Sequence, residues 1–177
     1  SQNILQNLDV NLNAVKYPFD VHFLNLHVQN QNLQMAYMDI RSEKPNLKTI
    51  VLLHGKNFNG AYWETTINAL AENGFRVIVP DQVGFGKSDK PQNFQYTFQQ
   101  LALNTKTLLD SLHINKTAIL GHSMGGMLAT RFALMFPETT EKLILENPIG
   151  LEDYKQLTPY KPVDFWYKNE LAQNYEK

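Results

Sequence analysis

The chain has 177 residues, of which 43% are hydrophobic and 19% charged, and its 16 basic and 17 acidic side chains leave a formal net charge of −1. This length and composition are typical of one globular domain, and the balanced charge gives no reason to expect nucleic acid or an anionic membrane as a partner. No apolar run approaches the ~18 residues that a membrane span needs. The absence of cysteine excludes disulfides, a thiolate nucleophile and cysteine metal sites, and it is compatible with both cytoplasm and periplasm.

The N-terminal region predicts an arm followed by a pair of strands. Residues 1–18 are polar and rich in Asn and Gln, and Pro18 closes them, so we expect an extended N-terminal arm. In 21–28 and again in 33–40, apolar and polar residues alternate with a period of about two, which is typical of antiparallel strands. Residues 29–32 are the predicted turn between them.

The middle of the chain alternates continuous apolar runs with segments of helical periodicity. The apolar runs predict strands that are buried on both faces, and the periodic segments predict amphipathic helices. The predicted strands are 49–53, 75–80, 117–120 and 142–145, and the predicted helices are 63–71, 97–112 and 124–136. This alternation predicts an α/β fold with a mostly parallel sheet, right-handed crossovers and helices on both faces, and with the antiparallel N-terminal pair at its edge.

The composition changes after residue 147, which sets the predicted organisation of the chain. Residues 148–177 are rich in aromatic side chains and are broken by Pro159 and Pro162. We interpret this segment either as the start of a lid that lines a substrate pocket or as ordinary packing of a terminal helix. The predicted units are therefore the arm (1–18), a core (19–147) and the start of a lid (148–177).

The most informative motif is the run Gly121-His122-Ser123-Met124-Gly125, which stands between a predicted buried strand and a predicted helix. A serine at such a sharp turn needs glycines two residues away on either side, because the strand and the helix approach closely there. Gly121 and Gly125 meet that need, so the run predicts a nucleophile elbow. The turn also leaves the Met124 backbone N–H at a helix N-terminus, where it can donate to a developing oxyanion.

A second loop, His54-Gly55-Lys56-Asn57, follows the strand that we expect beside the elbow strand. Acyl-transfer sites of this architecture take a second oxyanion donor from that loop, and the Lys56 N–H is the candidate. The Lys56 side chain either stays in solvent or reaches the substrate. We interpret His54 as a residue that holds the loop by hydrogen bonds rather than as a catalytic base.

The predicted loop from Asp81 to Asn93 contains two sequences that imitate nucleotide-binding motifs. The run Gly86-Lys87-Ser88 imitates the end of a phosphate-binding loop, but the first glycine of that motif would fall at Asp81. The run Gly84-Phe85-Gly86 imitates a dinucleotide fingerprint, but its third glycine would fall at Asp89. We therefore predict no nucleotide cofactor, and no other organic cofactor is indicated.

Together these motifs resemble the N-terminal half of an α/β-hydrolase-fold protein. They follow the order and spacing of that family over most of residues 20 to 150: His54-Gly55, Asp81-x-x-Gly84-x-Gly86-x-Ser88, Gly121-His122-Ser123-Met124-Gly125-Gly126 and Glu146-Asn147-Pro148. The resemblance implies an α/β-hydrolase fold that is incomplete without its C-terminal half.

The resemblance also implies Ser123 as the nucleophile, with the backbone amides of Lys56 and Met124 as the oxyanion hole. Relatives that cleave alkyl halides or epoxides carry an aspartate at this position. A serine instead implies an acyl-enzyme formed from a small ester, thioester, amide or C–C bond next to a carbonyl, with a carboxylic ester as the first expectation. Some serine relatives also perform perhydrolysis.

The expected catalytic base is missing from this sequence. In this family the acid and then the histidine follow the nucleophile, whereas no histidine follows His122 in this chain. We expect the His122 side chain to point away from the oxyanion side, His113 to lie at the far end of the long helix, and His22 and His27 to lie on the edge strands. The histidine is therefore expected on a C-terminal part absent from this chain, such as a second chain of about 100 to 150 residues produced by a nick in the lid.

The sequence leaves alternatives for the catalytic acid and for the class of function. Glu146, at the end of the predicted strand after the elbow helix, is a candidate acid, as is Asp153 more weakly, and a later aspartate on the absent part is the other choice. The alternative function is a catalytically inactive, hydrolase-like module that binds a small molecule. No metal site is predicted, because the five histidines are not grouped with carboxylates at ligand spacing.

Overall fold

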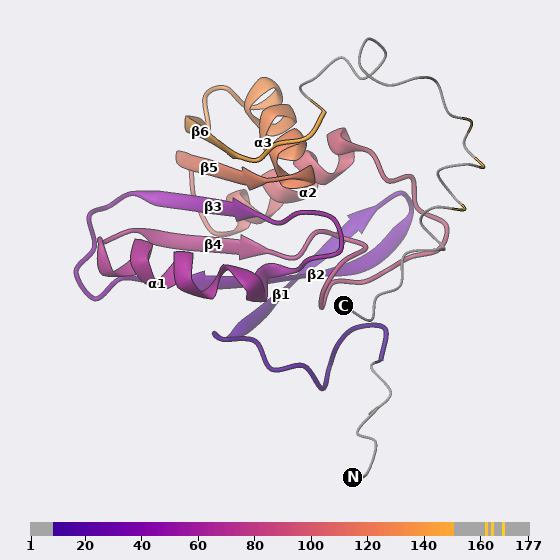
Figure 1. Ribbon diagram of the computed structural model, residues 1–177, viewed down its shortest axis with the longest axis horizontal. Helices are drawn as coiled ribbons and strands as arrows, with labels where there is room; N and C mark the ends of the chain where they lie inside the picture. The colour runs from indigo at the N-terminus through magenta and orange to yellow at the C-terminus, as the bar shows by residue number, and fades with distance from the viewer. Residues whose placement is uncertain (1–8, 151–161, 163, 165–167, 169–177) are drawn as a thin grey trace.

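The computed structural model describes residues 9–150, 162, 164 and 168, which form a six-stranded sheet with helices on both faces (Figure 1). The spatial strand order is β1-β2-β4-β3-β5-β6. The strands are β1 (Val21–Val28), β2 (Gln31–Ile40), β3 (Thr49–Leu53), β4 (Arg76–Pro80), β5 (Thr117–His122) and β6 (Thr140–Glu146). The helices are α1 (Glu64–Glu72), α2 (Phe98–Ser111) and α3 (Met124–Met135), and a short 3₁₀ turn, η1 (Gly60–Trp63), precedes α1.

The strand directions confirm the predicted α/β fold class. β1 pairs with β2, and β2 with β4, in antiparallel fashion, whereas β4, β3, β5 and β6 are parallel to one another. Parallel neighbours need crossover helices, and α1, α2 and α3 fill those connections. The antiparallel hairpin thus sits at one edge, as the period-two pattern predicted.

The hairpin turn is shorter than predicted. β2 begins at Gln31, so only Gln29 and Asn30 connect the two strands. Both residues have positive φ, 50° and 58°, which is the backbone of a two-residue turn whose twist matches that of the flanking strands. Asparagine tolerates this conformation well, whereas glutamine is an unusual residue for it, so composition alone did not mark the turn.

The sheet separates two hydrophobic clusters because side chains alternate along each buried strand. Val51 and Leu53 of β3 belong to the cluster that packs under α2 and α3. Ile50 and Leu52 belong to the cluster that includes Ile67 of α1. These four side chains are all buried, which explains why they form a continuous apolar run rather than an alternating pattern.

The described part of the arm corrects the prediction of an extended N-terminal segment. The Leu12 N–H donates to the Asp9 carbonyl at 3.0 Å and the Val15 N–H to the Leu12 carbonyl at 2.9 Å, so the chain turns here. Tyr17 is buried in the α1-side cluster. A polar composition predicted an extended arm because it does not reveal a single aromatic anchor of this kind.

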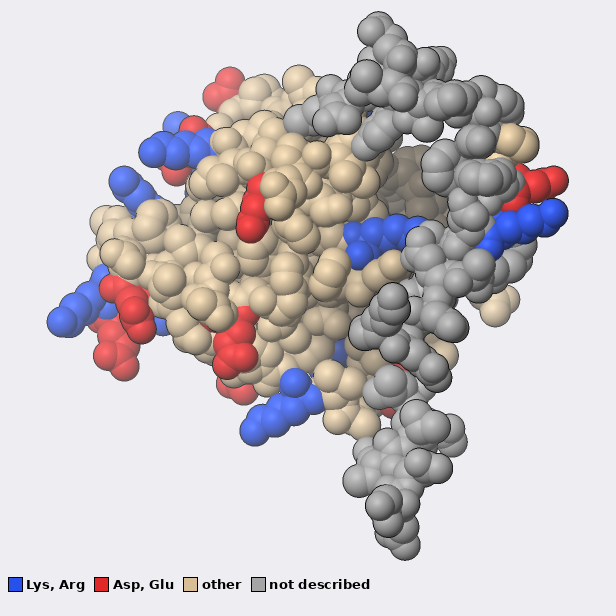
Figure 2. All heavy atoms as spheres, viewed as in Figure 1, with Lys and Arg blue, Asp and Glu red and all other residues tan. Residues whose placement is uncertain are grey.

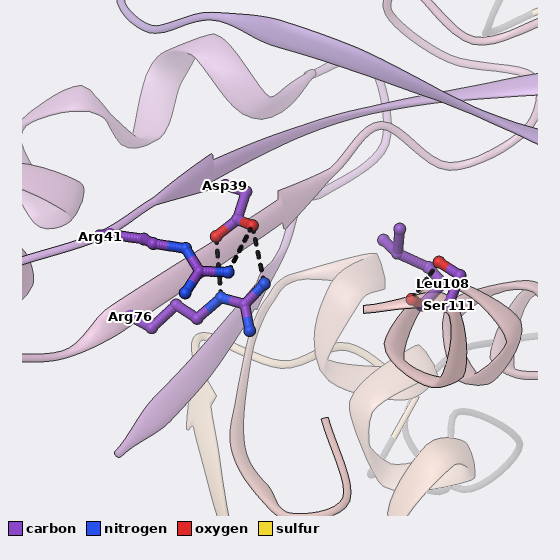
Figure 3. Close-up of polar contacts among 5 residues, drawn as sticks. All are labelled: Asp39, Arg41, Arg76, Leu108 and Ser111. Atoms are coloured by element: carbon purple, nitrogen blue, oxygen red, sulfur yellow. Dashed lines mark hydrogen bonds and ion pairs between the residues drawn. The ribbon is translucent and has the colours of Figure 1, made fainter. Parts of the chain in front are cut away.

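An ion pair joins the edge hairpin to the parallel part of the sheet (Figure 3). Arg76 on β4 donates two hydrogen bonds to Asp39 on β2, from Nε at 2.9 Å and from Nη2 at 2.7 Å. The exposed Arg41 adds a longer contact of 3.8 Å to the same carboxylate. The two-pronged geometry and the partial burial make this pair stronger than an ordinary surface salt bridge.

Side chains satisfy backbone groups at both ends of α2. The Thr97 hydroxyl accepts a hydrogen bond from the Gln100 N–H at 3.1 Å, which caps the N-terminus. At the C-terminus the Ser111 hydroxyl donates to the Leu108 carbonyl at 2.7 Å (Figure 3). Both ends of α2 are thus fixed, including the first turn, which lies near the elbow.

Basic and acidic side chains are interspersed on the face drawn in Figure 2, as the small net charge predicts. Among the described residues, no helix is long and apolar enough to cross a membrane. Most of the predicted lid, 148–177, lies outside the described residues, and so does Asp153.

Candidate active site

Ser123 occupies a strained backbone position between β5 and α3. Its φ of 55° and ψ of −118° belong to a region that residues other than glycine rarely adopt. The two glycines of the motif allow the close approach, because a Cβ at Gly121 would overlap the Gly125 carbonyl and a Cβ at Gly125 would overlap the Leu53 carbonyl. The geometry is that of a nucleophile elbow.

The backbone of the elbow is held on both sides. The Ser123 N–H donates to the Glu146 carbonyl at 3.1 Å, which ties the turn to the end of β6. The Ser123 carbonyl accepts from the Gly126 N–H at 2.9 Å in the first turn of α3. The residue itself is only partly buried, whereas its backbone is held by these hydrogen bonds.

The two sequence-predicted oxyanion residues lie beside the elbow. β3 and β5 pair in parallel with Leu53 opposite Gly121, which brings the loop after β3 next to Ser123. A Cβ built on Gly55 would lie 3.3 Å from the Ser123 Cβ, and Lys56 is the next residue of that loop. Met124 begins α3, and the first N–H groups of a helix have no acceptor within it. The structure therefore places Gly55, the neighbour of Lys56, and Met124 beside Ser123, and the role of the Lys56 and Met124 N–H groups stays a prediction.

His54 is fully buried and holds the loop after β3 by two hydrogen bonds. Its Nε2 accepts from the Gln82 N–H at 3.0 Å, which requires Nδ1 to carry the proton and donate to the Gly55 carbonyl at 2.9 Å. Burial lowers the pKa of His54 below its usual value of 6.5, so the ring is neutral at pH 7. Both ring nitrogens are engaged in structure, as the sequence interpretation expected.

His122 lies in an aromatic cluster on the η1 side of the elbow. Its ring is within 6.3 Å of the rings of Phe58, Tyr62 and Trp63, measured between centroids, and its Nδ1 lies 3.1 Å from the Tyr62 hydroxyl oxygen. Burial raises the pKa of Tyr62, so this phenol keeps its proton at pH 7. A Cβ built on Gly55 would lie 3.4 Å from His122 Nδ1, so the ring lies against the loop after β3. The prediction from the sequence that it points away from the oxyanion side was therefore wrong.

The remaining three histidines are remote from Ser123. His22 and His27 lie on β1, four strands away from β5, which corresponds to roughly 19 Å at ~4.8 Å per strand. His113 follows α2 at the amino end of β5, whereas Ser123 follows the carboxyl end. These placements agree with the positions expected from the sequence.

Glu146, the candidate acid, ends β6 with an exposed side chain. Its carbonyl holds the Ser123 N–H, and its charge contributes to raising the pKa of Tyr62 after the larger effect of burial, so the carboxylate lies near the aromatic cluster around His122. Within the described residues, no group of three or more His, Cys, Asp or Glu side chains is arranged to hold a metal ion.

Comparison with known proteins adds an independent finding. The family model of the alpha/beta hydrolase fold matches residues 48–172. The chain belongs to the α/β-hydrolase fold family. A solved α/β-hydrolase-like structure of a probable hydrolytic enzyme from Pseudomonas aeruginosa PAO1 is 52% identical, with a TM-score of 0.86, over 93% of this chain and 53% of that one.

Two further α/β-hydrolase relatives carry more specific names. A haloalkane dehalogenase from Mycobacterium marinum is 29% identical over 85% of this chain and 54% of its own. A meta-cleavage product hydrolase from Pseudomonas fluorescens IP01, solved as a serine-to-alanine mutant complexed with acetates, is 30% identical over 78% of this chain and 52% of its own, with a TM-score of 0.61. The chain thus spans about half the length of these relatives.

One polar centre of this α/β-hydrolase chain was missed by sequence reasoning. The buried Asp81 carboxylate accepts hydrogen bonds from the Tyr17 hydroxyl at 2.6 Å, the Gly60 N–H at 2.6 Å and the Lys87 N–H at 2.8 Å. A Cβ at Gly86 would overlap that carboxylate, which explains the glycine that imitated a nucleotide motif. The position of Asp81 in the sequence could have indicated this centre, because a buried aspartate that follows a buried strand needs several hydrogen-bond donors.

Proposed function

We propose that the chain is the nucleophile-bearing half of a serine hydrolase that acts through an acyl-enzyme on a small carbonyl substrate: an ester, a thioester, an amide or a C–C bond next to a carbonyl. The observation that carries the proposal is the backbone of Ser123, with a φ of 55° between a buried strand and a helix. Strain of this kind persists only where the surrounding structure holds it, and it concentrates at functional sites.

The proposed reaction assigns a role to each group at the elbow. A base removes the Ser123 hydroxyl proton as Oγ attacks the carbonyl carbon, and the N–H groups of Lys56 and Met124 stabilise the oxyanion. The base then gives its proton to the leaving group, and water hydrolyses the acyl-enzyme by the same steps. A carboxylic ester is the simplest substrate for this sequence.

The proposed base lies outside these 177 residues, on a continuation of the chain or on a second chain. His54 is engaged in the loop after β3 and His122 packs in the aromatic cluster, and the other three histidines are remote from Ser123. The chain also spans about half the length of its relatives. The outer edge of β6 has no strand partner among the described residues, and Leu143 and Ile144 on this strand are 39% and 41% exposed. Such an apolar edge suits further strands of the same sheet. We call the protein that includes these residues the complete enzyme.

A serine nucleophile favours carbonyl substrates over alkyl halides. Displacement of a halide by a carboxylate gives an ester, which water can hydrolyse to regenerate the enzyme. Displacement by Ser123 would instead give an alkyl ether, which water does not cleave. The name of the dehalogenase relative is therefore not carried over to this chain.

The acid that orients the base is either Glu146 or a carboxylate outside this chain. Replacement of Glu146 by Gln in the complete enzyme distinguishes the two, because loss of a triad carboxylate lowers kcat by about 10⁴-fold. A loss of that size identifies Glu146 as the acid. A kcat within a few-fold of the wild-type value assigns the acid to the residues outside this chain.

The test of the proposed function is covalent labelling of Ser123 by a fluorophosphonate. We expect the complete enzyme to be labelled stoichiometrically at Ser123, and Ser123→Ala to lose labelling together with about 10⁶-fold in kcat on p-nitrophenyl acetate. A protein that binds small acyl compounds but is not labelled is the inactive binding module, and that result overturns the proposal. Circular dichroism of Ser123→Ala is the control for folding.

A further inference from the structure

A cavity of about 460 Å³ opens beside the elbow, between the loop after β4 and the first turns of α2. Its size lies within the range of small-molecule sites, roughly 300–1,000 Å³. Its apolar wall consists of Phe85, Tyr96, Phe98, Leu101 and Met124. Met124 thus belongs to both sites, because its backbone N–H is the proposed oxyanion donor and the residue also lines the cavity.

The cavity wall offers no charge and few polar groups to a ligand. None of the described residues that line it is ionised at pH 7. The Thr97 hydroxyl accepts from the Gln100 N–H, and the Tyr96 hydroxyl donates to the Pro91 carbonyl at 3.2 Å, so both hydroxyls already have partners. A carboxylate placed here would lose its hydration without gaining an ion-pair partner, which is strongly unfavourable.

The Tyr96 side of the wall is preformed. Gly84 has a φ of 98°, and a Cβ there would lie 2.7 Å from the Tyr96 Cε1, so the missing side chain makes room for the ring. The Tyr96 ring also packs edge-on against Phe94, with 4.8 Å between the centroids. The cavity therefore needs no rearrangement of these residues to accept a ligand.

The position of the base decides which part of the substrate enters the cavity. The base gives its proton to the leaving group, so the leaving group lies on the side of the base. In the proposed mechanism the base comes from residues outside this chain. The cavity adjoins Met124, whose N–H is the proposed donor to the oxygen of the acyl carbonyl, so we assign the cavity to the acyl group.

We propose that this cavity holds the acyl part of the substrate and selects an uncharged, apolar acyl group against one that ends in a carboxylate. The inference rests on the proposed acyl-enzyme mechanism, and it names the substrate class that the mechanism leaves open. It also separates this protein from hydrolases whose acyl groups carry an anionic end.

The test compares two esters that differ only at the end of the acyl chain, p-nitrophenyl 6-methylheptanoate and mono-p-nitrophenyl adipate. They share the leaving group and the chain length, and an isopropyl group in the first replaces the carboxylate of the second. We expect the complete enzyme to prefer the neutral ester in kcat/KM by on the order of 100-fold. Equal values for the two esters would overturn the inference.

A pair of arginine variants locates the selectivity. Tyr96 in the wall is 46% exposed, and Leu103, on α2 but outside the wall, is 45% exposed, so both positions tolerate a charged side chain. Tyr96→Arg should reduce the preference for the neutral ester by about 10-fold, because the new cation pairs with the adipate carboxylate. Leu103→Arg should leave the preference unchanged. Equal preferences in the two variants would place the acyl group elsewhere.

A binding measurement separates the cavity from the mechanism. In the Ser123→Ala complete enzyme with ¹³C-methyl methionine, 6-methylheptanamide should shift the Met124 methyl resonance and leave that of Met135 unchanged, whereas adipamate should shift neither. A Met124 shift without fluorophosphonate labelling of the wild type would reject the acyl-enzyme and keep the cavity as an apolar binding site. Labelling without a Met124 shift would reject the cavity assignment and keep the acyl-enzyme.

Discussion

β4 and β5 flank β3, and the residues that follow each of them include glycines and a serine. The two loops differ in the role of their polar groups. In the β4 loop the Asp81 carboxylate accepts three hydrogen bonds, and the Ser88 hydroxyl accepts from the Ala36 N–H at 2.8 Å and donates to the Asp81 carbonyl at 2.6 Å. In the β5 loop the Ser123 backbone is held at both its N–H and its carbonyl, while the residue is only partly buried.

The difference separates a polar motif that builds structure from one that performs chemistry. Asp81 and Ser88 are buried and satisfied by protein groups, so they stabilise the fold and have no capacity for a ligand. Ser123 has the opposite combination, a strained and fixed backbone in a residue that is only partly buried. Loss of Asp81 should therefore reduce stability, and loss of Ser123 should reduce activity.

The largest effect on stability is expected for Asp81→Ala in the complete enzyme. This change leaves the Gly60 N–H, the Lys87 N–H and the Tyr17 hydroxyl without their buried acceptor, so the free energy of unfolding should fall by about 4 kcal/mol. Tyr17→Phe is the graded control, because it removes a single donor and should cost about 1 kcal/mol. Urea unfolding measures both. Equal costs for the two variants would contradict the role of Asp81 as a shared acceptor.

The same contrast explains what the sequence could predict. The strands and helices follow from periodicity and were confirmed, and the elbow follows from glycine spacing, because both signals are local in sequence. The Asp81 centre depends on Tyr17, which is 64 residues away, and on Gly60, which is 21 residues away. Pairings of that kind are decided by the strand order β2-β4-β3, which no local pattern encodes. The cavity was missed for the same reason, since its wall combines residues 84–85 and four residues of 96–101 with Met124.

A smaller effect on stability should reveal the strain at the elbow. Glycine adopts the Ser123 backbone angles without a steric penalty. The free energy of unfolding of Ser123→Gly should therefore be about 1 kcal/mol larger than that of Ser123→Ala. Both variants should be inactive. Ser111, at the end of α2, is the matched control, because there glycine should be about 1 kcal/mol less stable than alanine. If alanine is the more stable residue at both positions, the elbow backbone is not strained.

The weakest expected effect is a pH dependence of stability that comes from His54. Burial lowers the pKa of His54 in the folded protein below the usual 6.5, so the unfolded chain binds a proton that the folded protein rejects. The free energy of unfolding should therefore be fully retained above pH 6.5 and should fall below it, by up to about 1.4 kcal/mol per pH unit.

The test is the stability of His54→Gln between pH 8 and 5.5, where most carboxylates stay ionised. This variant should be less stable than the wild type at pH 8. Its stability should depend less on pH, because Gln does not titrate. His113→Gln, at an exposed histidine, should keep the wild-type slope. If the stability of His54→Gln depends on pH as steeply as that of the wild type, another group causes the pH dependence. In that case His54 can bind a proton in the folded protein.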